Sequence, residues 1–258
     1  MTASSPMSVT PGAAGLTRST AADLPEVDAV VVGAMDEEVS PYARRAREAG
    51  RTAGRGQAEL QHLTVAGARI LLVRSGIGLV NAAAAATAAL SVCRPRAILS
   101  TGSAGGLGAE VQVGDVVVGD RYTYTGADAT AFDYALGQVP GMPITYEANP
   151  GLLSAARSLT TSGGTLRVGQ MVSGDAFVTA GNVTQVREAF PHALTTDMET
   201  TALAQVAYSY GVPFLSVRAV SDLCGPVEDH REQVADFQLG LTGAAERSAD
   251  LVFALLDR

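Results

Sequence analysis

The feature that most constrains the fold is a repeated alternation between short apolar runs rich in β-branched residues and longer helical patterns. VDAVVVGAM (27–35) is a continuous run of this kind that ends at Gly33, so it predicts a strand buried on both faces. RAILSTG (96–102) and PFLSVRAVSD (213–222) are further predicted strands. Strands that alternate with helices pair largely in parallel and are covered on both faces. The sequence therefore predicts an α/β fold, a single-domain three-layer αβα arrangement around a mostly parallel mixed sheet.

The other elements follow from similar patterns. A helix is expected over 36–50, and Pro41 must lie in its first turn or bend it. LQHLTVAGARILLVRSG (60–76) predicts a hairpin that turns at Ala66-Gly67. The Gly- and Pro-containing region 125–149 predicts a long loop, which in a compact domain is usually functional or interfacial. Further helices are expected over 79–93, about 150–161, 182–189, 198–211 and from about 232, and further strands over 113–124, 167–174 and 193–197.

The domain organisation is simple. Residues 1–26 are rich in Ser, Thr, Ala, Pro and Gly and lack a basic start followed by an apolar run. We therefore expect a disordered tail and no signal peptide there. No internal repeat is evident, so residues 27–258 are predicted to form one domain.

Charge and composition exclude several classes of function. The formal net charge is -8 and the isoelectric point is about 4.9, so no broad basic face is available for nucleic acid or an anionic membrane. No run reaches the length of a membrane span. All 18 basic residues are Arg, which excludes Schiff-base chemistry on Lys.

The cysteines and histidines indicate a cytoplasmic protein without a metal. Cys93 and Cys224 are far apart in the chain and form no CxxC pair, so both are expected to be reduced thiols. The three histidines do not stand at metal-ligand spacing from one another or from a cysteine. We expect neither a metal nor another cofactor.

Carboxylates mark several predicted strand ends. Ligands of open α/β sheets bind at the carboxyl ends of strands. Four such junctions stand out, and three of them carry acids: GAMDEE (33–38), STGSAGG (100–106), TDMETT (196–201) and RAVSD (218–222). The glycines of the second junction could let backbone N–H groups approach an anion or a flat ligand.

Each junction also has a purely structural interpretation. Acids at 36–38 and Glu199 suit the first turn of a helix, STGSAGG could be a tight strand-to-helix turn, and Met198 could fill the core. Asp222 could cap the element that comes after it. Arg218 interrupts an apolar strand, and a buried guanidinium needs a partner, which a structural ion pair would supply.

Eight ordered strings carry a family resemblance that spans nearly the whole chain after residue 26. They are GAMDEEV, SGIG, TGSAGG, VGDVVV, TAFDYALGQVPG, VSGDAFV, DMETTA and VRAVSD. In this order they resemble the 5'-methylthioadenosine/S-adenosylhomocysteine nucleosidases of the nucleoside phosphorylase superfamily. The resemblance implies a nucleoside phosphorylase-like fold and hydrolysis of the N-glycosidic bond of 5'-methylthioadenosine and S-adenosylhomocysteine, with 5'-deoxyadenosine as a further candidate.

The resemblance also implies roles for single residues in that reaction. Asp222 matches the general acid that protonates adenine N7, and Ser221 matches the neighbour that orients it. Glu38 matches the carboxylate that activates the attacking water, which Ser103 and Arg218 would help to hold. An acid for the leaving purine and a base for water are what an oxocarbenium-like transition state requires.

Other matched positions belong to binding. Glu199 and Met198 match residues that bind the ribose, and Phe177 and Val178 match the adenine pocket. Phe132 and Pro140 match positions that reach a neighbouring subunit's pocket for the 5'-group, which implies a homodimer. The positions that would line the sugar and the base are Ile77, Ala104 and Gly105.

Three alternatives stay open at this point. A purine phosphorylase of the same superfamily would need a phosphate site where this chain has Met35-Asp36-Glu37-Glu38, and carboxylates repel phosphate. A futalosine-type nucleoside hydrolase is compatible with the pocket residues. A non-catalytic binding or storage homologue would not need the acid. The segment 223–237 departs from the family pattern, so no aromatic lid residue is assigned there.

Overall fold

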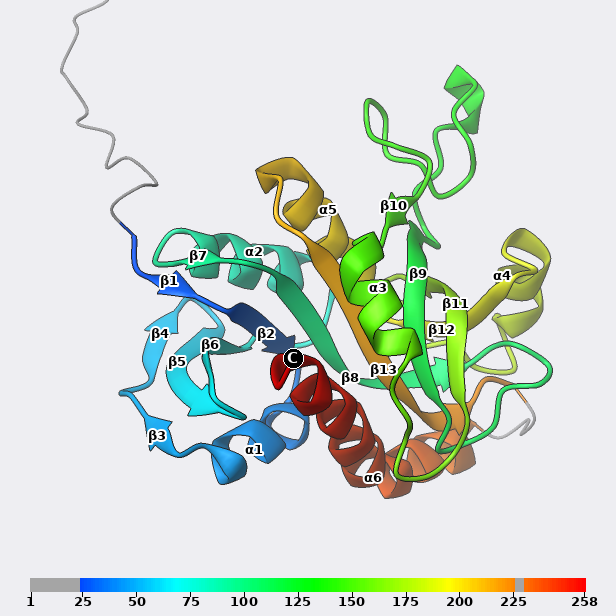
Figure 1. Ribbon diagram of the computed structural model, residues 1–258. Coiled ribbons are helices and arrows are strands. Elements are labelled where there is room, and N and C mark those ends of the chain that lie inside the picture. Colours follow the sequence, from blue (N-terminus) through cyan, green and yellow to red (C-terminus); the bar gives the residue numbers. More distant parts are fainter. Residues whose placement is uncertain (1–23, 226–229) are drawn as a thin grey trace, which may run out of the picture.

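A computed structural model describes residues 24–225 and 230–258 of the chain. Within these residues the predicted buried strands form the centre of one 11-stranded mixed sheet, and a two-stranded pair lies beside it (Figure 1). The strands are β1 (Glu26–Val27), β2 (Ala29–Gly33), β3 (Glu48–Ala49), β4 (Ala53–Arg55), β5 (Ala58–Val65), β6 (Ala68–Arg74), β7 (Arg94–Pro95), β8 (Ile98–Gly106), β9 (Val116–Tyr124), β10 (Tyr146–Glu147), β11 (Leu166–Ser173), β12 (Ala193–Asp197) and β13 (Phe214–Leu223).

Five strands of the sheet close on themselves. β8 pairs with β13, β13 with β9, β9 with β11, β11 with β12, and β12 again with β8. The pairs β8–β13, β9–β11, β11–β12, β2–β6 and β2–β8 are parallel, whereas β8–β12 and β9–β13 are antiparallel. Gly105 is in register with both Thr196 and Asp222. The carboxyl ends of β8, β12 and β13 therefore meet at one place.

Helices cover both faces of the sheet, as predicted (Figure 1). α2 (Leu79–Leu90) and α5 (Thr200–Tyr210) pack against each other on one face, and α1 (Asp36–Arg45) packs against α6 (His230–Leu256) on the other. α3 (Pro150–Arg157) contacts α6, and α4 (Val183–Ala189) precedes β12. The Ala-rich α2 approaches its neighbours closely because its buried side chains are all alanines. The three-layer α/β architecture is thus confirmed.

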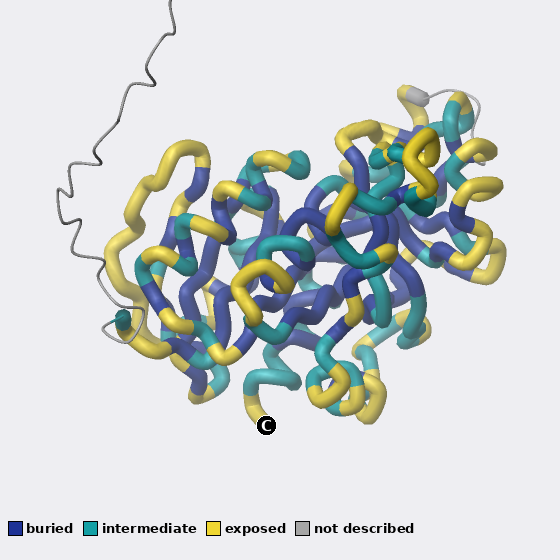
Figure 2. Tube along the Cα trace, turned by 90° about the horizontal axis from the view of Figure 1, so that it is seen from above, coloured by how far each residue is buried: buried dark blue, intermediate teal, exposed yellow. Residues whose placement is uncertain are grey.

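The core lies along the central strands. All five residues of β2 are buried, and β8 and β13 are buried along almost their entire length. Figure 2 shows this buried interior under a shell of exposed loops and helix faces. A continuous apolar run was therefore a correct indication of strands buried on both faces.

The predicted hairpin turns where the sequence indicated. β5 and β6 are antiparallel, and Val65 pairs with Ala68 across a two-residue turn. Ala66 and Gly67 both have positive φ, 46° and 77°. Such a turn has the twist that antiparallel strands require.

The first helix is shorter than predicted, because it ends at Arg45 instead of continuing to residue 50. Pro41 lies in the interior of α1 and not in its first turn, and whether it bends the helix stays a prediction. Proline removes the N–H that would have bonded the carbonyl of Glu37. The Ser40 hydroxyl donates to that carbonyl instead, at 3.2 Å. A local side-chain donor thus compensates the helix for its proline.

The Gly-rich STGSAGG stretch is not a turn. It continues β8 to Gly106, and β9 is the next element along the chain. The interpretation as a strand-to-helix turn was therefore wrong, while close approach of an anion or a flat ligand stays a prediction. The small residues serve another purpose, because Cβ atoms at Gly105 and Gly106 would come within 2.7 Å of the side chains of Cys224 and Leu223.

The predicted tail, 1–26, lies mostly outside the described residues. The described chain begins at Leu24, and Glu26 already belongs to β1, which pairs in parallel with β7. The Glu26 carboxylate also pairs with Arg94 at 2.8 Å. The folded part therefore starts slightly before the predicted boundary. None of the helices in the described ranges is both long and apolar enough to cross a bilayer.

Candidate active site

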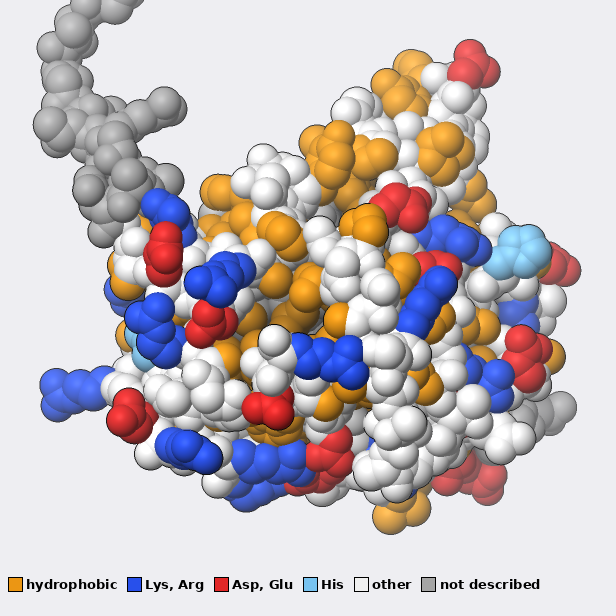
Figure 3. All heavy atoms as spheres, viewed as in Figure 1, with side chains coloured by type: hydrophobic (Ala, Val, Ile, Leu, Met, Phe, Trp, Pro, Cys, Tyr) orange, Lys and Arg blue, Asp and Glu red, His pale blue; other side chains and the backbone are white. Residues whose placement is uncertain are grey.

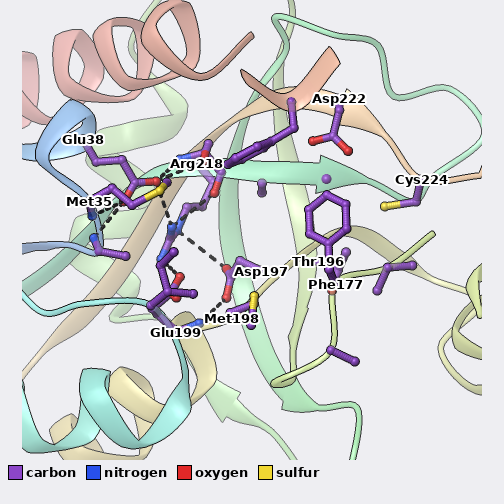
Figure 4. Close-up of a pocket in the computed structure, with 18 residues that line it drawn as sticks. Met35, Glu38, Phe177, Thr196, Asp197, Met198, Glu199, Arg218, Asp222 and Cys224 are labelled. Carbon is purple, nitrogen blue, oxygen red and sulfur yellow. Dashed lines mark hydrogen bonds and ion pairs between the residues drawn. The ribbon is translucent and has the colours of Figure 1, made fainter. Parts of the chain in front are cut away.

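A pocket opens where the carboxyl ends of β8, β12 and β13 meet the start of α1 (Figure 4). Its cavity measures about 150 Å³. Most of the residues that the sequence singled out line it, so segments far apart in the chain converge on one site. The lining residues are Ala34, Met35, Glu38, Ile77, Ser103, Ala104, Gly105, Ala176, Phe177, Val178, Thr196, Asp197, Met198, Glu199, Arg218, Asp222, Cys224 and Phe237.

Glu38 is fully buried in the first turn of α1. Its Oε2 accepts hydrogen bonds from the backbone N–H groups of Ala34 at 2.7 Å and Met35 at 3.2 Å. Its Oε1 accepts from the backbone N–H and the hydroxyl of Ser103, at 2.8 and 3.0 Å. The same carboxylate therefore accepts hydrogen bonds at the start of α1, as the capping interpretation requires, and also lines the pocket, as its predicted role would need.

Gly102 makes room for that carboxylate. Its φ is +136°, a conformation that side chains with a Cβ rarely adopt, and a Cβ there would overlap the Glu38 carboxyl group. The glycines of STGSAGG therefore bring β8 close to Glu38.

Arg218 lies between three carboxylates and is 1% exposed. Its guanidinium is 3.8 Å from Glu38, 3.6 Å from Asp197 and 3.5 Å from Glu199. It also donates to the Ser103 carbonyl at 3.1 Å and to the Ser100 hydroxyl at 3.0 Å. Burial opposes the charge of this arginine, but the three carboxylates outweigh it and raise its pKa.

Asp197 and Glu199 complete this cluster from the end of β12. Asp197 Oδ1 accepts from the backbone N–H groups of Glu199 and Thr200 at 2.9 and 2.8 Å, while its Oδ2 accepts no hydrogen bond within the described residues. Glu199 accepts from the N–H of Gly78 at 2.9 Å. Burial, which Arg218 offsets in part and the neighbouring carboxylates reinforce, raises the pKa of Glu199 to about 7.

Asp222 lies across the pocket from Glu38 (Figure 4). It is 2% exposed, and its Oδ1 accepts from the Ser221 hydroxyl at 2.7 Å. Its Oδ2 accepts from the carboxamide of Gln233 at 3.1 Å. Burial raises the pKa of Asp222, although these two hydrogen bonds act in the opposite direction.

Aromatic and apolar groups surround Asp222. Phe177 and Val178 follow β11, and Phe237 comes from α6. The rings of Phe177 and Phe237 meet edge to face, with centroids 5.9 Å apart. Phe237 is thus the aromatic side chain that the sequence left unassigned in the segment 223–237, of which residues 226–229 lie outside the described part.

Three predicted residues do not line the pocket. Ser221 is buried, and its hydroxyl contacts the site through Asp222 Oδ1 at 2.7 Å and the carbonyl of Ala104 at 3.4 Å. Phe132 and Pro140 belong to the segment between β9 and β10, and the Phe132 side chain is 78% exposed. Their predicted contact with a neighbouring subunit stays a prediction.

Sequence reasoning missed several polar residues of the site, among them Asp197 and Gln233. Asp197 ends a predicted strand beside Met198, and its position at a strand end was a usable signal. Gln233 had no such signal, because it lies in the segment that departs from the family pattern. The cavity wall also includes Ala34, Met35, Ala176, Thr196 and Cys224.

The two sides of the pocket offer different chemistry. On one side, Glu38 accepts four hydrogen bonds and faces a guanidinium, surroundings that suit an anion able to take a proton. On the other side, burial favours the protonated form of Asp222, which can then donate to a leaving group.

Comparison with known proteins identifies the family to which the chain belongs. The family model described as "Phosphorylase superfamily" matches residues 28–257. The chain is 33% identical to a 5'-methylthioadenosine/S-adenosylhomocysteine nucleosidase from Neisseria meningitidis in complex with methylthio-immucillin-A, over 91% of this chain and 99% of that one, with a TM-score of 0.82. For such a nucleosidase from Colwellia psychrerythraea in complex with adenine, the identity is 30%, the coverage 90% and 95%, and the TM-score 0.81.

A futalosine hydrolase from Helicobacter pylori has the same fold, with a TM-score of 0.79, 24% identity and coverage of 91% and 98%. At this identity the likeness concerns the fold alone. The whole-length family match and the 33% identity carry more weight. The chain therefore belongs to the phosphorylase superfamily and, within it, to the family of 5'-methylthioadenosine/S-adenosylhomocysteine nucleosidases.

Proposed function

We propose that this protein hydrolyses the N-glycosidic bond of 5'-methylthioadenosine and S-adenosylhomocysteine, releasing adenine and the corresponding thioribose. The observation that carries the proposal is a pair of buried carboxyl groups, Glu38 and Asp222, on two sides of one pocket. Hydrogen-bond donors and a guanidinium surround Glu38, whereas mainly apolar groups surround Asp222. Cleavage through an oxocarbenium-like sugar needs one acid and one base, and the pair supplies both.

The base would bind beside Asp222. A protonated Asp222 donates to N7 of adenine as the bond to the sugar breaks, and Ser221 holds the carboxyl group in position through its 2.7 Å hydrogen bond. Phe177 stacks on the purine, and the backbone of Val178 offers hydrogen bonds at its edge. Ala104 and Gly105 leave space for the flat ring.

The sugar would lie over the charged cluster. Glu199 binds the ribose hydroxyl groups, Met198 packs against the ring, and Ile77 covers it. Glu38 takes a proton from water as the water attacks the anomeric carbon, and Ser103 and Arg218 help to hold that water. The positive charge of Arg218 also offsets the repulsion among the three buried carboxylates around it.

Phosphorolysis fits this site poorly. Among the described residues that line the pocket, Arg218 is the only cation, and its guanidinium already serves three carboxylates. A phosphate dianion would face Glu38, Asp197 and Glu199 at short range in a poorly screened site. The electrostatic repulsion there would be on the order of several kcal/mol. Water is therefore the expected nucleophile.

Two other functions remain as alternatives with less support. A futalosine-type substrate would use the same acid and base, and the shared fold is compatible with it. A non-catalytic binding protein would have no need to keep Glu38, Glu199, Arg218 and Asp222 together in a buried cluster. Burying several charges lowers the stability of a fold, so such a cluster is expected where it serves a reaction.

The assembly expected for the proposed enzyme is a homodimer. The segment between β9 and β10 projects from the body of the molecule and carries apolar side chains on its surface (Figures 1 and 3). Phe132 is 78% exposed there, and Tyr208 at the end of α5, next to Tyr146 of β10, is 59% exposed. In the proposed dimer Phe132 and Pro140 would reach the partner's pocket for the 5'-group. We place the reaction, a step of thionucleoside salvage, in the cytoplasm.

The test is chromatographic detection of free adenine. The protein is incubated with 5'-methylthioadenosine, S-adenosylhomocysteine, 5'-deoxyadenosine or an aminodeoxyfutalosine, each with and without phosphate. We expect phosphate-independent release from the two thionucleosides. Release that requires phosphate would overturn the hydrolytic mechanism, and release from the futalosine alone would favour the second substrate class.

A further inference from the structure

One buried amide in the pocket region has no part in the proposed reaction. Gln233 lies in α6, three residues after the helix begins, and is 1% exposed. Its Nε2 donates to the carbonyl of Val178 at 2.8 Å and to Asp222 Oδ2 at 3.1 Å. One NH₂ group therefore joins the proposed general acid to the backbone of the proposed base pocket.

The two acceptors are those that an adenine would need. On one edge of adenine, the acceptor N7 lies next to the donor N6 amino group. A base that presents N7 to Asp222 thus brings its own NH₂ group beside Asp222, where it requires carbonyl or carboxylate acceptors. Val178 O and Asp222 Oδ2 are already bound to an NH₂ group, that of Gln233. Two such groups cannot occupy the same position.

We propose that Gln233 is a displaceable plug of the base pocket, a side chain that occupies the place of the purine amino group and must leave when the base binds. This inference rests on the proposed function, because it assumes that an aminopurine binds beside Asp222. In this proposal Gln233 influences the affinity for the base and takes part in no chemical step.

The described contacts hold the amide through its NH₂ group. Gln233 Oε1 is buried and accepts no hydrogen bond within the described residues. Two hydrogen bonds of the NH₂ group are therefore what the amino group of a base would have to replace. The NH₂ group binds two acceptors, while the carbonyl of the same amide is bound by no donor in the described part of the chain.

The size of the pocket agrees with a closed arrangement. Its cavity of about 150 Å³ is small, since sites for small molecules usually measure about 300–1,000 Å³. Phe237, one turn further along α6, packs against the ring of Phe177. The start of α6 therefore contributes Phe237 to the pocket wall, next to Phe177.

Displacement would also prepare the acid. The hydrogen bond from Gln233 favours the ionised form of Asp222 and lowers its pKa against the larger effect of burial. When the base replaces the amide, its amino group takes over that hydrogen bond, while exclusion of water by the base favours the protonated form of Asp222. Asp236 acts in the same direction as burial, because its negative charge raises the pKa of Asp222.

The test compares adenine binding to the wild-type protein, Gln233→Met and Gln238→Met by titration calorimetry. Methionine has nearly the length of glutamine but donates no hydrogen bond, and Gln238 is an exposed glutamine of the same helix. We expect Gln233→Met to bind adenine about tenfold more tightly, because the plug no longer competes. Gln238→Met should match the wild type. Unchanged or weaker binding by Gln233→Met overturns the plug.

A second measurement needs no ligand. The Asp222 carboxyl carbon is titrated by NMR in the ligand-free protein, with Asp222→Asn to assign its signal. Loss of the Gln233 hydrogen bond should raise the pKa of Asp222 in Gln233→Met, and an unchanged pKa would contradict the contact on which the plug depends. If adenine binds to neither protein, the proposed function fails, while this titration still decides whether Gln233 holds Asp222. If adenine binds equally to both, the plug alone fails.

Discussion

The two ends of the pocket are built on different principles. At the sugar end, backbone N–H groups hold Glu38, Asp197 and Glu199, which lie at the start of α1, at the end of β12 and at the N-cap of α5. Arg218, from the middle of β13, pairs with all three carboxylates. At the base end, Asp222 is surrounded by apolar groups and by side chains from the start of α6. The charges of the sugar end are therefore held mainly by backbone groups and by one another, whereas the base end consists of side chains from several elements, for which we propose rearrangement on binding.

This contrast fits the chemistry that each end is proposed to perform. Charge that develops on a sugar in the transition state is best stabilised by groups that do not move, since reorganisation would cost energy at the moment of reaction. A flat base has to enter and leave, and side chains from one helix can give way. Substitutions at each end can test whether the two really differ in this respect.

The largest effect is expected at the base end, from Asp222→Asn. The amide cannot protonate N7, so turnover of 5'-methylthioadenosine should fall on the order of 10²–10⁴-fold. Adenine binding should remain, because the pocket keeps its shape. The measurement is steady-state release of adenine together with titration calorimetry, and turnover at the wild-type rate would remove Asp222 from the mechanism.

At the sugar end, Arg218→Met should cost stability first. Removing the guanidinium leaves Glu38, Asp197 and Glu199 buried without their cation. Breaking a buried ion pair typically destabilises a fold by about 3–5 kcal/mol. Urea unfolding at pH 7 measures this loss, with Arg51→Met at an exposed position as the control. Arg218→Lys, which keeps the charge, should lose less, and a wild-type midpoint for Arg218→Met would show that the cluster is not held by charge.

The pH dependence of stability should report the same cluster. Glu199 binds a proton more tightly in the folded than in the unfolded protein, because its pKa is raised from 4.5 to about 7. The free energy of unfolding should therefore decrease as pH rises from about 4.5 to about 7, by at most on the order of 3 kcal/mol from this group. Glu199→Gln should flatten that slope in urea titrations across this range. An identical slope in the variant would mean that Glu199 titrates normally.

The smallest effect is expected from Phe237→Leu at the base end. Leucine keeps an apolar side chain but loses the edge-to-face contact with Phe177. Such contacts are typically worth about 0.5–1.5 kcal/mol. The Michaelis constant should rise severalfold with little change in kcat. A fall in kcat of the size expected for Asp222→Asn would show that the base end is as rigid as the sugar end.

Much of this arrangement can be predicted from local sequence. The buried strands, the hairpin at Ala66-Gly67 and the alternation of strands with helices follow from periodicity and turn chemistry, which neighbouring residues determine. The same logic predicts that acids at strand ends belong to a site. The acids Glu38, Glu199 and Asp222 line one pocket, together with Arg218, which stood out as a charge in an apolar strand, and the functional roles of all four stay predictions.

Local sequence failed where a residue's environment comes from distant segments. Pro41 inside α1 is tolerated because Ser40 supplies a bond, and STGSAGG stays in β8 because β12, β13 and Glu38 approach it closely. Sequence alone was thus enough for the long strands, the helices and their order, whereas the short strands β1, β3, β4, β7 and β10 were not predicted. Packing in three dimensions was needed to bring one guanidinium to three carboxylates and to place Gln233 between Asp222 and Val178. Such contacts depend on strand register and helix packing across the sheet, which no local pattern encodes.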